Sequence, residues 1–325
     1  MEVIDVPWVE KYRPRTLADI VGHDKSIDRI KNLIADGSMP HMIFEGPAGT
    51  GKTSTALAMT NDLFRGKPRR VVNESVKELN ASDARGINVV RTTLKDYVKG
   101  KKNPQVPFKV LILDEADNMT APAQQALRRQ MEKYSKNCRI ALMCNYSNKI
   151  IPPIQSRCAV VHFKPLLAED IKKRVSYIID KERVRVSDDG IEALAYIAYG
   201  DLRKSINTLQ AASMFSEGDD YEIVEDDIYA ITGMVDRREI QGLIQEVFTG
   251  SLGSALDAIE GMLNSGSSGK EIALQVFMEA KMDDNMSVAD KITISSLASD
   301  AVYRISMGCS EVIQLRAMVA GMHGG

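Results

Sequence analysis

The stretch of sequence that decides the fold is Gly46-Pro47-Ala48-Gly49-Thr50-Gly51-Lys52-Thr53. It has the form G-x-x-x-x-G-K-T of a phosphate-binding P-loop. The apolar run 42–44 before it suits the end of a strand, and residues 54–64 after it have the apolar spacing of a helix. A strand, a glycine-rich loop and a helix in this order place backbone N–H groups around a polyphosphate. This context disfavours the alternative interpretation, a glycine-rich turn that arose by chance.

Two side chains of the loop have the chemistry for a nucleotide and its metal ion. Lys52 is expected to reach the β- and γ-phosphates, and the Thr53 hydroxyl is expected to ligate Mg²⁺. The three glycines allow the backbone to approach the phosphates without a Cβ in the way. We therefore predict that all eight residues of the loop bind the nucleotide.

A second motif, at the end of the apolar run 109–113, supplies two adjacent carboxylates. Asp114 and Glu115 follow a run that is typical of a strand buried on both faces of a parallel sheet. We expect Asp114 to bind Mg²⁺ directly or through water, and Glu115 to orient and polarise the attacking water. A charge pair at a helix N-terminus is the competing interpretation, and the P-loop upstream argues against it. Asn145 ends the next apolar run, and its amide suits a phosphate oxygen or the lytic water, although alone it would be a turn residue.

The order of the expected elements indicates the fold class. Strands alternate with helices up to about residue 164, which predicts an open parallel α/β sheet with its ligand at the carboxyl ends of the strands. Beyond Lys164-Pro165-Leu166 no further buried strand is evident, and helical periodicity dominates. A chain of 325 residues exceeds one typical core. We predict an α/β P-loop domain over 1–164, a helical lid domain over 165–230 and an all-α domain over 231–325.

Charge is distributed unevenly along a chain whose net charge is −2. Residues 66–110 contain eleven Lys/Arg and four Asp/Glu, whereas residues 216–239 contain nine acidic and two basic residues. A basic segment on a nearly neutral chain suits a polyanionic partner. A solvated basic surface explains the composition equally well, so charge alone leaves the partner open.

Composition and the N-terminal residues exclude some classes of protein. No run approaches the length of a membrane span, and residues 1–5 have neither the basic nor the apolar segment of a secretory signal. The four cysteines lack the C-x-x-C spacing of a zinc or redox site. We expect a cytoplasmic protein with reduced cysteines and no membrane partner. Prolines at both ends of the segment 7–14 predict irregular, extended backbone there, with Trp8 as a packing anchor.

Assembled, these motifs resemble the AAA+ ATPases, and within them the clamp-loader small subunits of the archaeal replication factor C type. The resemblance rests on P-W-V-E-K-Y-R-P at 7–14, L-N-A-S-D-A-R-G at 79–86, L-D-E-A-D at 113–117, S-R-C at 156–158 and G-D-L-R-K-S-I-N at 200–207. These motifs cover residues 1 to about 230, and beyond them the likeness is only the helical character of the family's collar, its oligomerisation domain. Ala48 replaces a proline that is frequent in the family, and Ala84 an acidic residue, but neither position carries a catalytic group.

The resemblance implies roles for further residues. Asn145 looks like sensor 1, and Arg203 looks like sensor 2, which would touch the γ-phosphate of its own subunit. Arg157 looks like the arginine finger, which would reach the ATP of a neighbouring subunit, whereas S-R-C alone would suggest a surface ion pair. A planar guanidinium supplies charge where the transition state of phosphoryl transfer needs it. The family's base-binding boxes correspond to Val6, Pro7, Tyr12, Arg13, Val21 and Gly22, although Tyr12 also suits a core.

The implied function is that of an ATPase subunit that loads a sliding clamp onto primer–template DNA. ATP and Mg²⁺ are the implied cofactors, and the clamp, further copies of the chain and a large subunit are the implied protein partners, at the nucleoid. DNA would be bound through phosphates without regard to sequence, with Arg85 and Arg91 as candidates. The helix over 88–98 and the basic loop 99–103 correspond to the family's clamp-facing edge.

Two alternatives remain at this point. One is a different AAA+ DNA machine, such as a branch-migration helicase or a replication initiator, and the lack of an evident winged-helix signature weakens the initiator. The other is a non-hydrolysing structural subunit, against which the presence of Lys52, Asp114, Glu115 and Arg157 argues.

Overall fold

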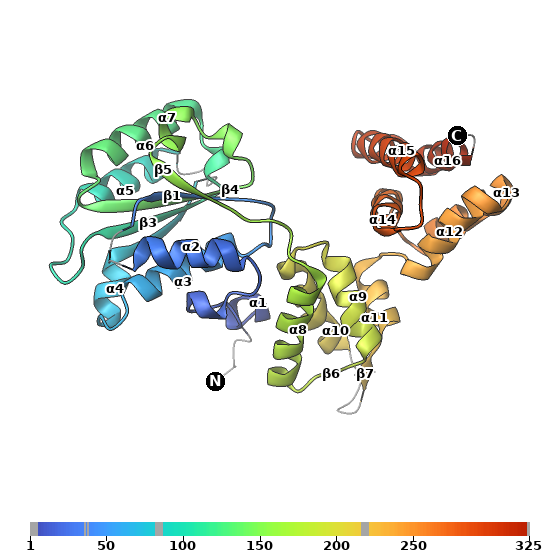
Figure 1. The fold of residues 1–325 in the computed structure, drawn as a ribbon, viewed down its shortest axis with the longest axis horizontal. Coiled ribbons are helices and arrows are strands. Elements are labelled where there is room, and N and C mark those ends of the chain that lie inside the picture. The colour runs from blue at the N-terminus through green and yellow to red at the C-terminus, as the bar shows by residue number, and fades with distance from the viewer. Residues whose placement is uncertain (1–5, 36, 38, 82–86, 216–220, 324–325) are drawn as a thin grey trace. The chain divides into compact units, whose positions relative to one another are not determined.

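The chain is organised as two compact units in the computed structural model (Figure 1). One unit comprises residues 1–184 and 194–210, and the other comprises 185–193 and 211–325. The residues that the structure describes are 6–35, 37, 39–81, 87–215 and 221–323, with backbone alone for 87–91. The predicted domain boundaries, after residues 164 and 230, stay predictions.

The first unit is built on a five-stranded parallel sheet with the strand order β2-β3-β4-β1-β5. The strands are β1 (His41–Glu45), β2 (Val76–Asn80), β3 (Lys109–Asp114), β4 (Cys138–Cys144) and β5 (Cys158–His162). In the centre, Ile43 of β1 is paired with Leu142 of β4 and Val160 of β5. The predicted open parallel sheet is confirmed, and the P-loop follows a strand in its interior.

Helices cover both faces of this sheet (Figure 1). Met42 and Phe44 of β1 belong to one buried cluster together with side chains of α2 (Asp24–Ile34) and α3 (Lys52–Leu63). Ile43 points the other way and joins a second cluster. That cluster contains side chains of α5 (Ile87–Lys99), α6 (Ala121–Tyr134) and α7 (Pro152–Gln155). Because successive side chains of a strand alternate between faces, a strand covered on both sides needs the continuous apolar run that the sequence shows.

Two helices in this unit differ from the sequence prediction. The segment 7–14 was expected to be extended, but Trp8–Lys11 form α1, so that expectation is wrong for these residues. Pro7 precedes α1 with φ of −49°, and its carbonyl accepts hydrogen bonds from the backbone N–H groups of Glu10 and Lys11. Proline at the start of a helix loses no intrahelical hydrogen bond. The same rule explains α4 (Arg69–Ser75), which follows Pro68 and was not predicted. Trp8 is 6% exposed, as expected of a packing anchor.

The chain beyond β5 is mainly helical, as predicted. It forms α8 (Ala168–Glu182), α9 (Asp188–Ala198), α10 (Leu202–Phe215) and α11 (Glu225–Thr232). Two strands of two residues each, β6 (Arg185–Val186) and β7 (Glu222–Ile223), pair in parallel in the second unit. The expectation of no further buried strand is therefore corrected at β7, where Ile223 is fully buried. Two residues are too few to produce an alternating pattern that sequence reasoning could detect.

Five helices form the C-terminal part of the second unit and share one apolar core. They are α12 (Arg237–Thr249), α13 (Leu252–Asn264), α14 (Gly269–Met282), α15 (Val288–Ser306) and α16 (Glu311–His323). Two of the residues buried in this part are polar, Gln275 and Glu279 of α14. Among the helices described, none has the length and apolarity of a membrane span. All four cysteines are free, and burial raises the pKa of three thiols to about 12, those of Cys138, Cys144 and Cys158.

Candidate nucleotide-binding site

The P-loop connects β1 to α3 at the carboxyl edge of the sheet. Gly51 is the N-cap of α3 with φ of 90°, a backbone conformation that glycine adopts without strain. Gly49 has φ of 68°, and its carbonyl accepts a hydrogen bond of 3.2 Å from the backbone N–H of Leu202. A Cβ built on Gly49 would lie 1.6 Å from Oδ1 of Asp201. The loop therefore needs glycine at this position because the start of α10 packs directly against it.

Lys52 is buried at the first position of α3, and its ammonium group contacts oxygen atoms. Its Nζ donates to the carbonyl oxygens of Gly46 and Pro47, both at 2.7 Å, and to Oδ1 of Asn145 at 3.2 Å. Burial lowers the pKa of Lys52, and the carboxylate of Asp114 opposes that effect. An ammonium group that is bound only to neutral oxygens can exchange these partners for phosphate oxygens, which bear charge.

Asp114 and Thr53 come from different elements but lie in contact. The Thr53 hydroxyl donates to Oδ2 of Asp114 at 2.8 Å, while the backbone N–H of Glu115 donates to Oδ1 of Asp114 at 2.8 Å. A carboxylate and a hydroxyl at this spacing fit the oxygen ligands that Mg²⁺ prefers. The residues that the sequence assigns to the metal ion therefore lie together, next to the P-loop.

Glu115 is exposed and has a left-handed backbone, with φ of 52° and ψ of 39°. This conformation is uncommon for a residue other than glycine. The Asn118 side chain donates to Oε2 of Glu115 at 3.2 Å. Glu115 thus follows the last residue of β3, and it lies at the edge of the sheet where Asp114 and Asn145 also lie.

Two helices of the predicted lid contribute to the same cavity. Asp201 accepts hydrogen bonds from the backbone N–H groups of Arg203 and Lys204 at 2.9 and 3.2 Å, which fixes the start of α10. Arg203 of α10 and Arg174 of α8 both line the cavity together with the P-loop. Two arginines from these helices are therefore part of the cavity wall, and the Arg174 guanidinium donates to the carbonyl oxygen of Tyr12.

The cavity brings together most of the predicted site residues. Its lining includes Tyr12, Arg13, Ala48, Gly49, Gly51, Lys52, Thr53, Asp114, Glu115, Asn145 and Arg203. The other predicted base- and loop-binding positions, Val6, Pro7, Val21, Gly22, Gly46, Pro47 and Thr50, are not among the residues that line it. Tyr12 donates its hydroxyl to Oε1 of Glu182 at 2.6 Å, and its carbonyl accepts from Arg174. Tyr12 therefore joins the N-terminal segment to α8 beside the cavity.

The structure also adds lining residues that the sequence reasoning missed. They are Val9, Pro14, Ser54, Asp117, Met143, Cys144, Arg174, Leu202 and Ile206. Asp117 accepts a hydrogen bond of 3.2 Å from the backbone N–H of Asn145, so it fixes the end of β4. Its position in L-D-E-A-D could have indicated a role, whereas no local pattern distinguishes Arg174 from other basic residues of an amphipathic helix.

Arg157 is also not among the residues that line this cavity. Arg157 follows α7 and is exposed, with its guanidinium 2.7 Å from Oε1 of Glu132. Arg85 and the side chain of Arg91 lie outside the described residues. The roles proposed for all three stay predictions.

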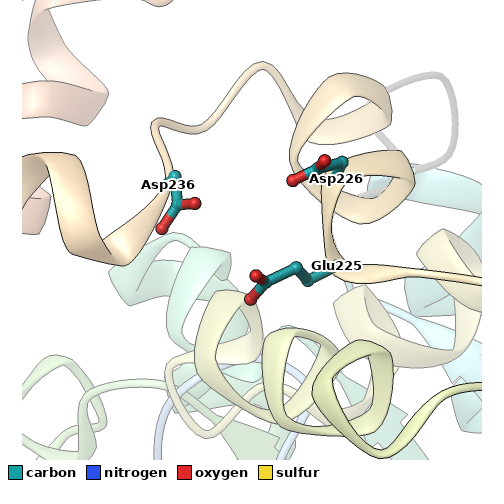
Figure 2. A group of neighbouring side chains, drawn as sticks. All are labelled: Glu225, Asp226 and Asp236. Atoms are coloured by element: carbon teal, nitrogen blue, oxygen red, sulfur yellow. The ribbon is translucent and has the colours of Figure 1, made fainter.

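A group of carboxylates at the junction of α11 and α12 has a different character. Figure 2 shows Glu225 and Asp226 at the start of α11 and Asp236 before α12. Their oxygens lie within 4.8 Å of one another. Arg238 forms ion pairs with Glu225 and, at 3.0 Å, with Asp236. Arg238 therefore offsets part of the negative charge of this group, and Asp236 also accepts from the backbone N–H of Arg238 as the N-cap of α12.

Comparison with known proteins agrees with this geometry. Residues 42–166 match the model of the ATPase family associated with various cellular activities (AAA), and residues 235–321 match the replication factor C C-terminal domain. The replication factor C small subunit of Archaeoglobus fulgidus is 45% identical over 316 residues, covering 96% of each chain. That of Methanococcus maripaludis is 43% identical over 317 residues, covering 97% of this chain and 98% of the relative.

The chain belongs to the replication factor C small-subunit family. This membership confirms the predicted family and supports ATPase activity and a role in DNA replication as part of a clamp loader. Among solved structures, the RuvB Holliday junction branch migration motor of Thermotoga maritima has a TM-score of 0.58 at 16% identity, covering 81% of this chain and 91% of that one. At this identity the likeness is one of fold alone, and the helicase alternative is not favoured.

Proposed function

We propose that this replication factor C small-subunit homologue couples ATP hydrolysis to the loading of a sliding clamp onto primer–template DNA. The observation that carries the ATPase part of the proposal is the convergence of Lys52, Thr53, Asp114, Asn145 and Arg203 on one cavity. Membership of the replication factor C small-subunit family supports the clamp-loading part. ATP with Mg²⁺ is the nucleotide that this set of groups suits. Thr53 and Asp114 would bind the metal ion, and the ion would neutralise charge on the phosphates.

The chain's own residues have distinct parts in hydrolysis. Lys52 would bind the β- and γ-phosphates, Asn145 and Arg203 would orient the γ-phosphate, and Glu115 would position the attacking water. Arg157 lies apart from these residues beside Glu132. A guanidinium outside its own cavity suits a site that is completed between subunits, so we propose that Arg157 acts on the ATP of a neighbouring copy. Hydrolysis would then depend on assembly.

DNA and the clamp are the remaining proposed partners, together with further copies of the chain and a large subunit. Arg85 and Arg91 are proposed to contact DNA phosphates, which would make binding independent of sequence. The helix α5 and the basic loop that follows it are proposed to face the clamp. The complex would act in the cytoplasm, at the nucleoid.

The decisive experiment measures ATP hydrolysis by the assembled complex alone, with primed DNA, with the clamp, and with both. We expect the largest stimulation with both together, because a clamp loader should hydrolyse ATP only when the clamp and the primed DNA are both bound. A branch-migration motor would instead respond to branched DNA and ignore the clamp. Stimulation by DNA that is unaffected by the clamp would therefore contradict the proposal.

A further inference from the structure

The side chain of Arg157 is bound by acceptors of its own chain. Its Nη2 lies 2.7 Å from Oε1 of Glu132, and its Nη1 donates to the carbonyl oxygen of Pro153 at 2.6 Å and to Oγ of Ser156 at 3.4 Å. Arginine has a long side chain with many rotamers. Contacts on both terminal nitrogens restrict this one to a single orientation, with its guanidinium at the surface.

Glu132 is itself oriented by a second arginine. Its Oε1 accepts from Nε of Arg128 at 3.0 Å, one turn earlier on α6. The hydrogen bond from Arg128, together with the charges of Arg128 and Arg157, lowers the pKa of Glu132. The carboxylate is therefore ionised near neutral pH and is available as a charged acceptor for Arg157.

A buried amide joins α6, which carries Glu132, to the start of α7, the short helix that ends two residues before Arg157. Gln124 of α6 is 3% exposed, and its Oε1 accepts from the backbone N–H of Ile151 at 2.8 Å. Its Nε2 donates to the carbonyl oxygens of Lys149 and Met119 at 2.9 and 3.2 Å. These bonds fix the start of α7 against α6. The distance between Glu132 and Arg157 is thus set by the scaffold, because both helices also pack into the same apolar cluster.

We propose that Glu132 is a positioning residue for Arg157: it orders the guanidinium before a neighbouring subunit's ATP arrives. This inference rests on the proposed action of Arg157 on a neighbour's nucleotide. An exposed ion pair adds little to the stability of a fold, so stability does not explain the arrangement. A side chain that is already ordered loses no further conformational entropy when the neighbour's ATP binds. The catalytic step therefore does not include that entropic cost.

The test compares Glu132→Ala with the unchanged chain in the full complex with clamp and primed DNA. We expect kcat for ATP to fall by about 3- to 10-fold, the range that follows from losing the order of one long side chain, with KM for ATP unchanged. Glu132→Gln keeps an acceptor oxygen and should recover most of the rate. Asp28→Ala is the matched control, because it breaks an exposed ion pair with Lys31 on α2 and should change nothing.

A double-variant comparison separates positioning from a general structural role. Arg157→Ala should leave only slow residual hydrolysis, which a single-turnover measurement can follow. In that background Glu132→Ala should have no further effect, since the residue through which it acts is gone. An equal loss in both backgrounds, a lowered thermal midpoint, or an unchanged kcat in Glu132→Ala would overturn the inference while leaving the proposed function intact. If Arg157→Ala itself hydrolyses ATP normally, the shared site and this inference both fail.

Discussion

Buried polar side chains are used differently in the nucleotide-binding region and in the C-terminal helices. Lys52 contacts two P-loop carbonyls and the Asn145 amide, all neutral oxygens. In α14, by contrast, Gln275 donates to the carbonyl of Val235 at 2.7 Å and accepts from its N–H at 3.0 Å. Glu279 is paired with Arg237 at 3.0 Å and accepts from Gln241 at 2.8 Å.

The difference separates polar groups that bind a ligand from polar groups that stabilise a fold. The charge of Lys52 is compensated only partly by its present partners, so a phosphate improves its surroundings. The amide of Gln275 has both of its groups matched by one backbone unit, so a ligand would have nothing to add. A buried polar residue in this family member is therefore informative about function only when its partners leave charge uncompensated.

The largest expected effect concerns the shared site. Lys52→Ala and Arg157→Ala should each abolish stimulated hydrolysis, and a finger supplied in trans is typically worth about 10³–10⁵ in rate. In a mixed ring of the two variants, some interfaces pair an intact P-loop with an intact Arg157, so activity should return. The measurement is ATPase rate against mixing ratio, with co-assembly verified by native mass. Zero activity at every ratio in verified mixed rings would show that Arg157 does not act in trans.

The next effect separates nucleotide binding from chemistry. Glu115→Gln keeps the shape of the side chain and removes the carboxylate that positions water, so turnover should drop by roughly 10²–10⁴. ATP affinity, measured by titration calorimetry, should stay near that of the unchanged chain, whereas Lys52→Ala should lose affinity. Normal turnover in Glu115→Gln would remove Glu115 from the mechanism.

A smaller effect concerns pH and the core of the sheet. Burial, with a contribution from Arg139, lowers the pKa of His41 to about 4, and its Nδ1 accepts from the backbone N–H of Ile140 at 3.0 Å. Between this value and the ordinary pKa near 6.5, the unfolded chain binds a proton that the folded chain does not, so stability falls as pH falls through that window. The loss should reach about 3 kcal/mol.

Denaturant unfolding monitored by the fluorescence of Trp8 checks this prediction, because the chain's single tryptophan is buried in the first unit. The His41→Asn variant keeps a side-chain acceptor for Ile140 but does not titrate. Its unfolding free energy should therefore depend less on pH between about 6.5 and 4. Identical pH profiles for the variant and the unchanged chain would contradict the assignment.

The smallest expected effect concerns the buried amide of Gln275, which stabilises the fold of the C-terminal helices. Gln275→Leu leaves the N–H and C=O groups of Val235 buried without their partner, which should destabilise the C-terminal helices by about 2 kcal/mol. Hydrogen exchange in α14 should accelerate by roughly 30-fold in consequence. Gln245→Leu, on the exposed surface of α12, is the control and should change exchange little. Reduced ATP binding by the isolated Gln275→Leu chain would contradict the assignment of a purely structural role to Gln275.

Motifs with fixed spacing made the nucleotide site predictable from the sequence. Lys52, Thr53 and Asp114 were identified because phosphate and metal chemistry constrain residue type and distance along the chain. Arg174 was not identified from the sequence, because it reaches the cavity through the packing of α8. No local sequence pattern specifies that packing. The same limit applies to Glu132, whose significance depends on a residue in another element.

The sequence predicts the helical character of the C-terminal part. It does not predict the hydrogen bonds and ion pairs that the buried polar residues form there. Apolar periodicity predicted an all-α region over 231–325, and α12 to α16 lie within it. Gln275 and Glu279 look like ordinary polar positions of an amphipathic helix in the sequence, although both are buried. The helix α1 was missed for a different reason, since prolines mark helix starts as well as irregular segments.

The contact of Gly49 with Asp201 has a consequence for how this sequence can diverge. A side chain at position 49 would occupy the space of the Asp201 carboxylate, and that carboxylate in turn caps the helix that presents Arg203. Positions 49 and 201 are distant in the chain, but the residue at one of them limits which residues are tolerated at the other. Homologues that carry a larger residue at one of them should show a compensating change at the other, so that covariation across an alignment would record the closeness of the P-loop to the start of α10.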